Sequence, residues 1–180
     1  MAGHSRPRWG WHRLDSEWAR RLVEAAGVRP GELVVDIGAG TGSLTGALLD
    51  AGAVVVAVEL HPVRVAALRR RFAGAPVTVV RADATDLRLP RRPFRAVANI
   101  PFAISKPVIR RLVAPGSRMT AADLVVPRHV AAEWTGPRAP GSRRWRAQFD
   151  AATGRSVPSW AFSPPPSTHA VVLVLRRRTP

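Results

Sequence analysis

The sequence contains no cysteine and no tyrosine, and Lys106 is its only lysine. The absence of cysteine excludes disulfide bonds and thiolate zinc sites and is consistent with a reducing compartment. No apolar run reaches the roughly 18 residues that a membrane-spanning helix needs, and the polar N-terminus MAGHSRPRWGWHR has no apolar core of a secretory signal. We therefore expect a cytoplasmic protein that makes no contact with a membrane, and we predict no metal site.

Acidic side chains are also scarce. Lys and Arg total 28 against 12 for Asp and Glu, which gives a formal net charge of +16. Such a balance favours a polyanionic partner, because each neutralised phosphate releases counterions and arginine binds phosphate in a bidentate manner. A GC-rich genome would explain the choice of arginine over lysine, but it would not explain the scarcity of acids. The composition thus indicates a nucleic-acid partner.

Apolar runs alternate with amphipathic segments along the 180 residues. Buried strands are predicted in the run ELVVDI and at 53–60, 77–83, 94–102 and 121–127, with a final strand in THAVVLVLRRR and another within RWRAQFDAATGRSVPSWAF. Helices are predicted at 15–27, 41–52 and 61–72, after Pro107, and from Arg128, while GPRAPGSRRWR reads as a loop. This alternation predicts an α/β fold with a parallel sheet and helices on both faces. The last two strands lack an intervening helix, which predicts a hairpin-like edge.

The string VVDIGAGTG (34–42) follows a strand and opens a helix. Gly38 and Gly40 fit the dinucleotide pattern G-x-G-x-x-G, but Ser43 occupies its third glycine position. What stands instead is D-x-G-x-G-x-G, from Asp36 to Gly42, a pattern typical of S-adenosylmethionine-dependent methyltransferases. Asp36 can hold the amino group of the cofactor or order the loop.

Two further acids end the next two predicted strands. Glu59, followed by Leu60, is placed to accept both ribose hydroxyls of a nucleotide cofactor. Asp83 can accept the adenine amino group while the Ala84 N–H binds a ring nitrogen, or it can simply cap a turn. Because parallel strands present their carboxyl ends at one edge of a sheet, these acids and Asp36 predict one cofactor crevice.

NIPF ends the fourth predicted strand at the same edge. Methylation of an exocyclic adenine amine requires acceptors for its two hydrogens, which Asn99 and the backbone near Ile100 can supply. Pro101 would hold the turn rigid, and Phe102 could stack on an unpaired base. Phe162, in FSPPP, is a second stacking candidate. The simpler alternative is an Asn-Pro turn beside a core phenylalanine.

The order DIGAGTG, Glu59, RADA, NIPF and FSPPP resembles the Erm family of ribosomal RNA adenine-N6 methyltransferases, which confer macrolide, lincosamide and streptogramin B resistance. That family is similar to the housekeeping small-subunit dimethyladenosine transferases. The resemblance implies a Rossmann-like class I methyltransferase fold, mostly parallel and seven-stranded with an antiparallel edge strand. It also implies transfer of methyl from S-adenosyl-L-methionine to the N6 amine of an adenine in 23S rRNA.

Carried over to this sequence, the resemblance places a set of residues around the cofactor and the base. His12, Leu14, Asp36, Gly38, Gly40, Glu59, Leu60, Asp83, Ala84 and Asn99 would contact the cofactor, and Asn99, Ile100, Pro101, Phe102 and Phe162 would act on the adenine. The family's N-terminal element reads roughly Q-N/H-F-L/I, where this chain has WHRL (11–14), so Trp11 and Arg13 depart from the pattern.

The resemblance also implies a domain organisation. We expect a basic arm at 1–13, a catalytic domain at 14–180 and no C-terminal helical RNA-binding domain, as in the short mycobacterial-type Erm proteins. In that case the arm, RRWR (143–146) and RRR (176–178) would hold the RNA. The protein would be a monomer that does not act on DNA.

Other functions fit less well. A 16S rRNA adenine methyltransferase and a non-catalytic ribosome-assembly or RNA-binding factor are the main alternatives. DNA adenine and protein glutamine methyltransferases usually carry P-P-Y or P-P-W after the Asn, where this chain has I-P-F. A dehydrogenase is disfavoured by the missing third glycine.

Overall fold

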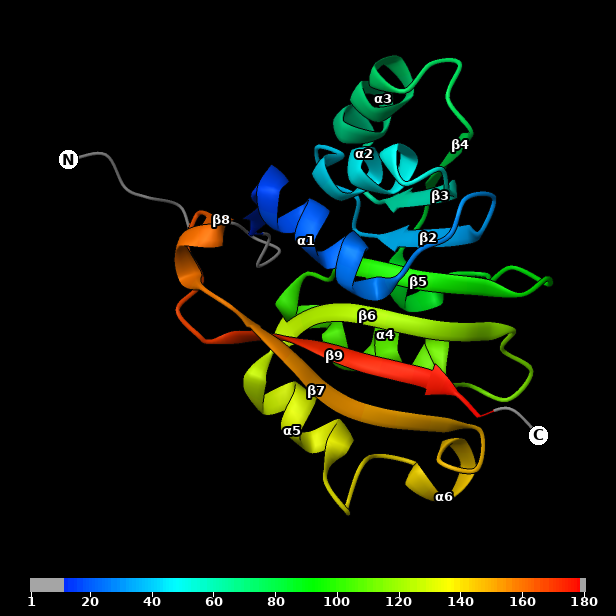
Figure 1. Cartoon of the computed structure of the whole chain (residues 1–180), viewed down its shortest axis with the longest axis vertical. Helices are drawn as coiled ribbons and strands as arrows, with labels where there is room; N and C mark the ends of the chain where they lie inside the picture. Colours follow the sequence, from blue (N-terminus) through cyan, green and yellow to red (C-terminus); the bar gives the residue numbers. More distant parts are fainter. Residues whose placement is uncertain (1–11, 179–180) are drawn as a thin grey trace.

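The fold is built on a seven-stranded sheet with the strand order β4-β3-β2-β5-β6-β9-β7, seen in a computed structural model that describes residues 12–178 (Figure 1). Its strands are β2 (Leu33–Ile37), β3 (Val54–Glu59), β4 (Val77–Arg81), β5 (Phe94–Asn99), β6 (Met119–Pro127), β7 (Phe149–Val157) and β9 (Ala170–Arg177). Strands β4, β3, β2, β5 and β6 are mutually parallel. Strand β9 is antiparallel and lies between β6 and the edge strand β7. The predicted fold class is confirmed.

Helices cover both faces of this sheet (Figure 1). The elements are α1 (Ser16–Ala26), α2 (Ser43–Asp50), α3 (Pro62–Arg71), α4 (Ser105–Leu112), α5 (Arg128–Thr135) and the short α6 (Ser142–Trp145). Apolar residues of α1 and α2 and Leu68 of α3 share one hydrophobic cluster, and those of α4 and α5 share a second one across the sheet. The central strands are therefore buried on both sides, which is why they read as continuous apolar runs.

Helix α1 shows how the sequence sets these elements. The carboxylate of Asp15 accepts the backbone N–H of Glu17 at its start, and Gly27 ends the helix in a left-handed conformation with φ 65°. The stripe that includes Trp18 and Leu22 is buried against the sheet. No helix in the segment 12–178 is long and apolar enough to cross a membrane.

A second, two-stranded sheet joins distant parts of the chain. Strand β1 (Arg13–Leu14) pairs in antiparallel fashion with β8 (Phe162–Ser163). Leu14 is buried, so this pairing fixes the start of the described chain beside FSPPP. Residues 1–11 of the predicted basic arm lie outside the described residues, whereas its last position, Arg13, belongs to β1.

Several predicted boundaries differ from the structure, as does one predicted loop. Strand β5 ends at Asn99 rather than at Phe102, and α4 begins at Ser105 rather than after Pro107. Proline is tolerated in the first helical turn, where its missing N–H would have no partner. The predicted loop at 137–146 contains α6, because buried Trp145 packs against Trp134 with 5.5 Å between ring centroids.

The C-terminal arginines bind the protein itself. Arg176 donates to both carboxylate oxygens of buried Asp123, at 2.8 and 3.0 Å. Arg177 donates to the backbone carbonyls of Met119 and Ser117, both at 2.7 Å. The guanidinium groups of Arg176 and Arg177 therefore stabilise the end of β9, and the role of this tail in holding RNA stays a prediction.

Arg146 of the RRWR segment is engaged in the same way. It donates to the backbone carbonyls of Thr135 and Gly136, and only Arg143 and Arg144 of that segment are exposed.

We predict that Arg176→Met lowers the free energy of unfolding by roughly 2 kcal/mol, because it leaves the buried carboxylate of Asp123 with only Arg95, 3.7 Å away. The matched control is Arg178→Met, which breaks an exposed ion pair with Asp150 and should cost about 0.5 kcal/mol or less. Urea denaturation of both variants measures the difference. Equal effects would show that the Asp123 pair does not stabilise the sheet.

Candidate cofactor and target-base site

The carboxyl ends of the parallel strands form one rim, as the sequence predicts. A small pocket there is lined by residues from three separate segments: Arg13, Leu14, Asp36, Gly38, Ala39, Gly40, Thr41, Ser43, Leu44 and Asn99. The glycine loop after β2, the end of β5 and strand β1 thus meet at one place. Five of the residues predicted to bind a cofactor line this pocket: Leu14, Asp36, Gly38, Gly40 and Asn99.

Left-handed backbone shapes the glycine loop. Gly38 has φ 78°, and a Cβ at this position would lie 2.9 Å from Cδ of Pro101. Gly42 has φ 87°, and its Cβ would lie 2.6 Å from Cε2 of Phe72 behind α3. Glycine at these two positions lets the NIPF turn and α3 approach the loop closely, which leaves a backbone-walled cradle of the kind that a nucleotide cofactor occupies.

Glu59 links this loop to the end of β3. Its side chain is buried; Oε2 accepts the N–H of Gly40 at 2.9 Å and Oε1 accepts the N–H of His61 at 2.8 Å. Each carboxylate oxygen retains a further acceptor position, so Glu59 fits the ribose hydroxyls that the sequence predicts for it. Leu60, the next residue, is 43% exposed beyond the end of the strand and presents an apolar surface there.

Asp36 is enclosed within the fold. It is 1% exposed, and the Thr45 hydroxyl of α2 donates to its Oδ2 at 2.6 Å. Burial, with a smaller repulsion from Glu59, raises the pKa of Asp36 to about 7, although the hydrogen bonds from Thr45 act in the opposite direction. Of its two predicted roles, ordering the loop is the one that these contacts provide.

Asp83 caps a turn. Its Oδ1 accepts the N–H and the hydroxyl of Thr85, at 2.8 and 2.7 Å, at the start of a 3₁₀ turn (η1, Ala84–Asp86). These hydrogen bonds lower the pKa of Asp83, so the exposed carboxylate stays ionised. Its other oxygen remains available at the rim beyond β4, while Ala84 is buried beneath the turn.

The Asn99 amide is oriented by the N-terminal segment. Its Nδ2 donates to the backbone carbonyl of His12 at 2.6 Å, and among residues 12–178 its Oδ1 has no donor and remains a free acceptor. Ile100 is 1% exposed and anchors the chain in the core, and Pro101 leads into the 3₁₀ turn Phe102–Ile104 (η2). The NIPF motif thus forms a turn and also holds the side-chain amide of Asn99 in a fixed orientation at the rim.

The predicted aromatic sandwich is not formed in this structure. Phe102 and Phe162 lie edge to face, with centroids 6.3 Å apart and planes at 76°. This separation is that of two rings in contact, with no space for a base between them. Stacking on both faces of an adenine therefore requires one ring to rotate. Phe162 is held in the core, with 4% of its surface exposed, whereas Phe102 is only partly buried, so Phe102 is the ring that can turn.

His12 lies with these rings. Its ring centroid is 5.4 Å from that of Phe102 and 6.5 Å from that of Phe162, and its Nδ1 is 2.7 Å from the backbone carbonyl of Pro164. The side chain of His12 is absent from the lining of the rim pocket. The ring of His12 therefore lies in the aromatic cluster beside the rim pocket, and its contact with the cofactor stays a prediction.

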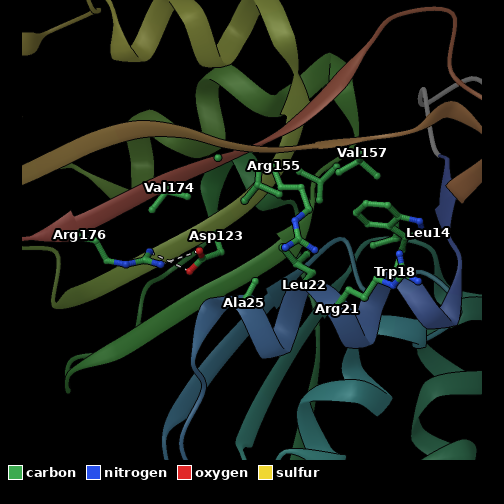
Figure 2. Close-up of a pocket in the computed structure, with 13 residues that line it drawn as sticks. Leu14, Trp18, Arg21, Leu22, Ala25, Asp123, Arg155, Val157, Val174 and Arg176 are labelled. Carbon is green, nitrogen blue, oxygen red and sulfur yellow. Dashed lines mark hydrogen bonds and ion pairs between the residues drawn. The ribbon is translucent and has the colours of Figure 1, made fainter.

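A larger cavity of about 200 Å³ lies elsewhere, between α1 and strands β6, β9 and β7 (Figure 2). Its lining is mostly apolar and includes Trp18, Leu22 and Val174, and its acid, Asp123, is paired with Arg176 (Figure 2). The cavity contains neither the glycine loop nor any rim acid. The smaller rim pocket is therefore the candidate for the cofactor site, because it contains the glycine loop and Asp36.

A glycine loop after the first parallel strand, an acid ending the next strand and an Asn-Pro turn beside them define a Rossmann-like S-adenosylmethionine-dependent methyltransferase. The chain belongs to the ribosomal RNA adenine dimethylase family, whose sequence model matches residues 6–180. Methyl transfer to ribosomal RNA adenine with S-adenosyl-L-methionine is the chemistry of this family, as the sequence predicts.

Similar proteins refine this assignment. Ribosomal RNA small subunit methyltransferase A of Thermosynechococcus vestitus is 36% identical over 186 residues, which cover 96% of this chain and 69% of that protein. The protein of the same name from Leifsonia xyli is 47% identical over 108 residues, 56% of this chain and 38% of that one. This chain thus spans about two thirds or less of the length of these relatives.

Solved structures show the same fold. The 23S rRNA methyltransferase ErmE superposes with a TM-score of 0.81 and 28% identity over 94% of this chain and 70% of that one. A dimethyladenosine transferase from Plasmodium falciparum has a TM-score of 0.79 at 23% identity, covering 93% and 64% of the two chains.

Sequence reasoning missed two contributors to the site. Thr45 is one turn into α2, and nothing in the pattern signals its hydrogen bond to Asp36. Arg13 belongs to a two-residue strand, which is too short to be recognised by periodicity.

Asp36 should make stability depend on pH. Between pH 4 and 7 the folded state keeps a proton that the unfolded chain has released, so this group lowers the free energy of unfolding as pH rises. In Asp36→Asn, which cannot ionise, stability relative to the parent protein should increase by roughly 2 to 4 kcal/mol between pH 5 and pH 8. Denaturant unfolding without cofactor measures this difference, and a difference independent of pH would contradict the assignment.

Proposed function

We propose that this protein transfers methyl groups to the N6 amine of an adenine in small-subunit ribosomal RNA. The observation that carries the proposal is the free Oδ1 of Asn99 at the rim, beside a glycine loop that fits the cofactor. The names of relatives that are 34 to 37% identical over nearly all of the chain support the small subunit as the source of the adenine. This revises the expectation, taken from the Erm resemblance, of a 23S rRNA target.

The residues of the rim have separable roles in this proposal. Glu59 would hold the ribose hydroxyls of S-adenosyl-L-methionine, and the free oxygen of Asp83 would accept the adenine amino group. When bound, the cofactor supplies an electrophilic methyl group on a sulfonium. Asn99 Oδ1 and the backbone carbonyl of Ile100 would accept the hydrogens of the target amine and so aim its nitrogen at the methyl group. The N–C bond forms as the S–C bond breaks, which leaves a neutral thioether, and the proton released from the methylated nitrogen passes to solvent.

The base would stack on Phe102 after that ring turns away from Phe162. Since a paired base cannot reach the rim, the adenine must be unpaired or flipped out of its helix. Positioning and hydrogen bonding carry the reaction in this proposal, because the one acid that lines the rim pocket among residues 12–178, Asp36, is buried and hydrogen-bonded to Thr45.

A 23S rRNA adenine is the second candidate, because the ErmE structure is similar to this chain over nearly its whole length. A basic protein with an intact Asn99 and glycine loop fits either rRNA.

The proposal predicts methyl transfer from labelled S-adenosylmethionine to 16S rRNA, with 23S rRNA and DNA as parallel substrates. Primer extension on the labelled RNA should stop at an adenine in 16S rRNA. A stop only in 23S rRNA would contradict the small-subunit assignment and favour the second candidate. Cofactor binding without transfer to any of the three would contradict the enzymatic proposal.

Asn99→Ala tests the role of the amide. We expect the turnover number to fall by a factor of about 100 or more, because an acceptor that orients the amine in the transition state is lost. The affinity for S-adenosylhomocysteine, measured by calorimetry, should change much less than the turnover number. Gln148→Ala is a matched control that removes an amide far from the rim. Near-parental turnover in Asn99→Ala would show that this amide does not position the substrate.

A further inference from the structure

We propose that Arg13 binds the carboxylate in the amino-acid portion of the cofactor. This inference rests on the proposed function, because it assigns a further residue to the same cofactor site. It adds a contact that departs from the family pattern, in which the third position of the N-terminal element is an apolar aromatic residue and not an arginine.

The first observation is the place of Arg13. It lines the rim pocket together with Gly38, Gly40 and Asn99. Its backbone is fixed, because Arg13 pairs with Ser163 in the β1–β8 sheet and the next residue, Leu14, is buried in the core. A cationic side chain is thus attached at a defined position of the pocket.

The second observation is that Arg13 has no competing partner there. Within residues 12–178 its side chain makes no hydrogen bond or ion pair, unlike the side chains of Arg176, Arg177 and Arg146. The only other charged side chain that lines the pocket is Asp36, which is 1% exposed and bonded to Thr45. An anionic ligand group in this pocket would therefore meet one unpaired guanidinium.

The strand order indicates which end of the cofactor lies near Arg13. Asp83 and Glu59, which suit the adenine and the ribose, follow β4 and β3 on one side of the glycine loop. Asn99, to which the methyl group must point, follows β5 on the other side. The remaining substituent of the sulfonium is the amino acid, and Arg13 and Leu14 of β1 line the same pocket as the glycine loop and Asn99. The carboxylate of this amino acid is the anionic group that a guanidinium binds best.

His12 is not available for this contact. The family pattern places residue 12 near the methionine end of the cofactor, but here its ring lies against Phe102 and hydrogen-bonds at Pro164. Its backbone carbonyl is also used, by Asn99. The role therefore passes to the adjacent residue, Arg13.

A phosphate of the RNA next to the target adenine is the competing ligand, since it offers the same anionic oxygens. The pocket lining favours the cofactor, because Arg13 shares this pocket with the glycine loop. The two sources are separated by testing ligands that contain no phosphate.

The experiment is isothermal titration calorimetry of the whole chain with S-adenosylhomocysteine and with methylthioadenosine, which has the same nucleoside and sulfur but no amino-acid portion. The proteins are the parent, Arg13→Gln, Arg13→Lys and the control Arg20→Gln, which removes an exposed arginine of α1 away from the pocket. In Arg13→Gln we expect affinity for S-adenosylhomocysteine to fall about ten-fold and affinity for methylthioadenosine to stay within about two-fold. Arg13→Lys should lie between, because lysine keeps the charge without the bidentate geometry.

Three results would overturn the inference. Equal losses of affinity for both ligands would show that Arg13 shapes the site without binding the carboxylate. Thermal unfolding of Arg13→Gln and Arg20→Gln would reveal whether the substitution also lowers the stability of the protein. Unchanged affinity for S-adenosylhomocysteine, combined with weaker RNA binding and a shallower salt dependence, would assign Arg13 to an RNA phosphate. Failure of the parent protein to bind S-adenosylhomocysteine would overturn the cofactor site itself. Cofactor binding without rRNA methylation would contradict only the proposed function.

Discussion

The buried carboxylate of Glu59 fixes the shape of the glycine loop, and the rest of the site depends on that shape. By accepting the N–H groups of Gly40 and His61 it ties the loop after β2 to the end of β3. The loop can then receive Pro101 at Gly38, where any side chain would collide. This contact brings the NIPF turn against the cofactor cradle, and Asn99 in turn bonds to the backbone of His12. These contacts connect the rim pocket, the side-chain amide of Asn99 and strand β1.

The net charge of +16 is divided between two uses. Arg95, Arg176 and Arg177 bind carboxylates and backbone carbonyls at the ends of strands, where they satisfy groups that would otherwise be buried without partners. Arg13, Arg143 and Arg144 are exposed. Arginines of this second kind make no internal hydrogen bond with their side chains among residues 12–178, so they can bind a polyanion without breaking a contact of the fold. The number of arginines in the chain therefore exceeds the number of arginine side chains that are free of internal contacts. The position of each arginine in the fold determines whether it has such contacts.

Much of the fold follows from local pattern, because strands buried on both faces have continuous apolar runs and glycines mark the loop. The rim acids and Asn99 could be placed from the sequence for the same reason: each directly ends such a run. Contacts between distant segments could not be read in this way. The β1–β8 pair contains two residues on each side, the edge-to-face arrangement of Phe102 and Phe162 depends on packing, and the bond of Asn99 to His12 spans 87 positions. The internal contacts of the tail arginines were not foreseen, because their partners, Asp123 and the carbonyls of Ser117 and Met119, lie far away in sequence.

The central claim is that the rim pocket, and not the larger cavity beside Trp18, holds the cofactor. A crystal structure of the protein with S-adenosylhomocysteine tests this most directly. The account predicts the ribose hydroxyls on Glu59, the adenine near Asp83 and the sulfur directed toward Asn99. Ligand density in the cavity between α1 and β9, or a ribose without contact to Glu59, would contradict it.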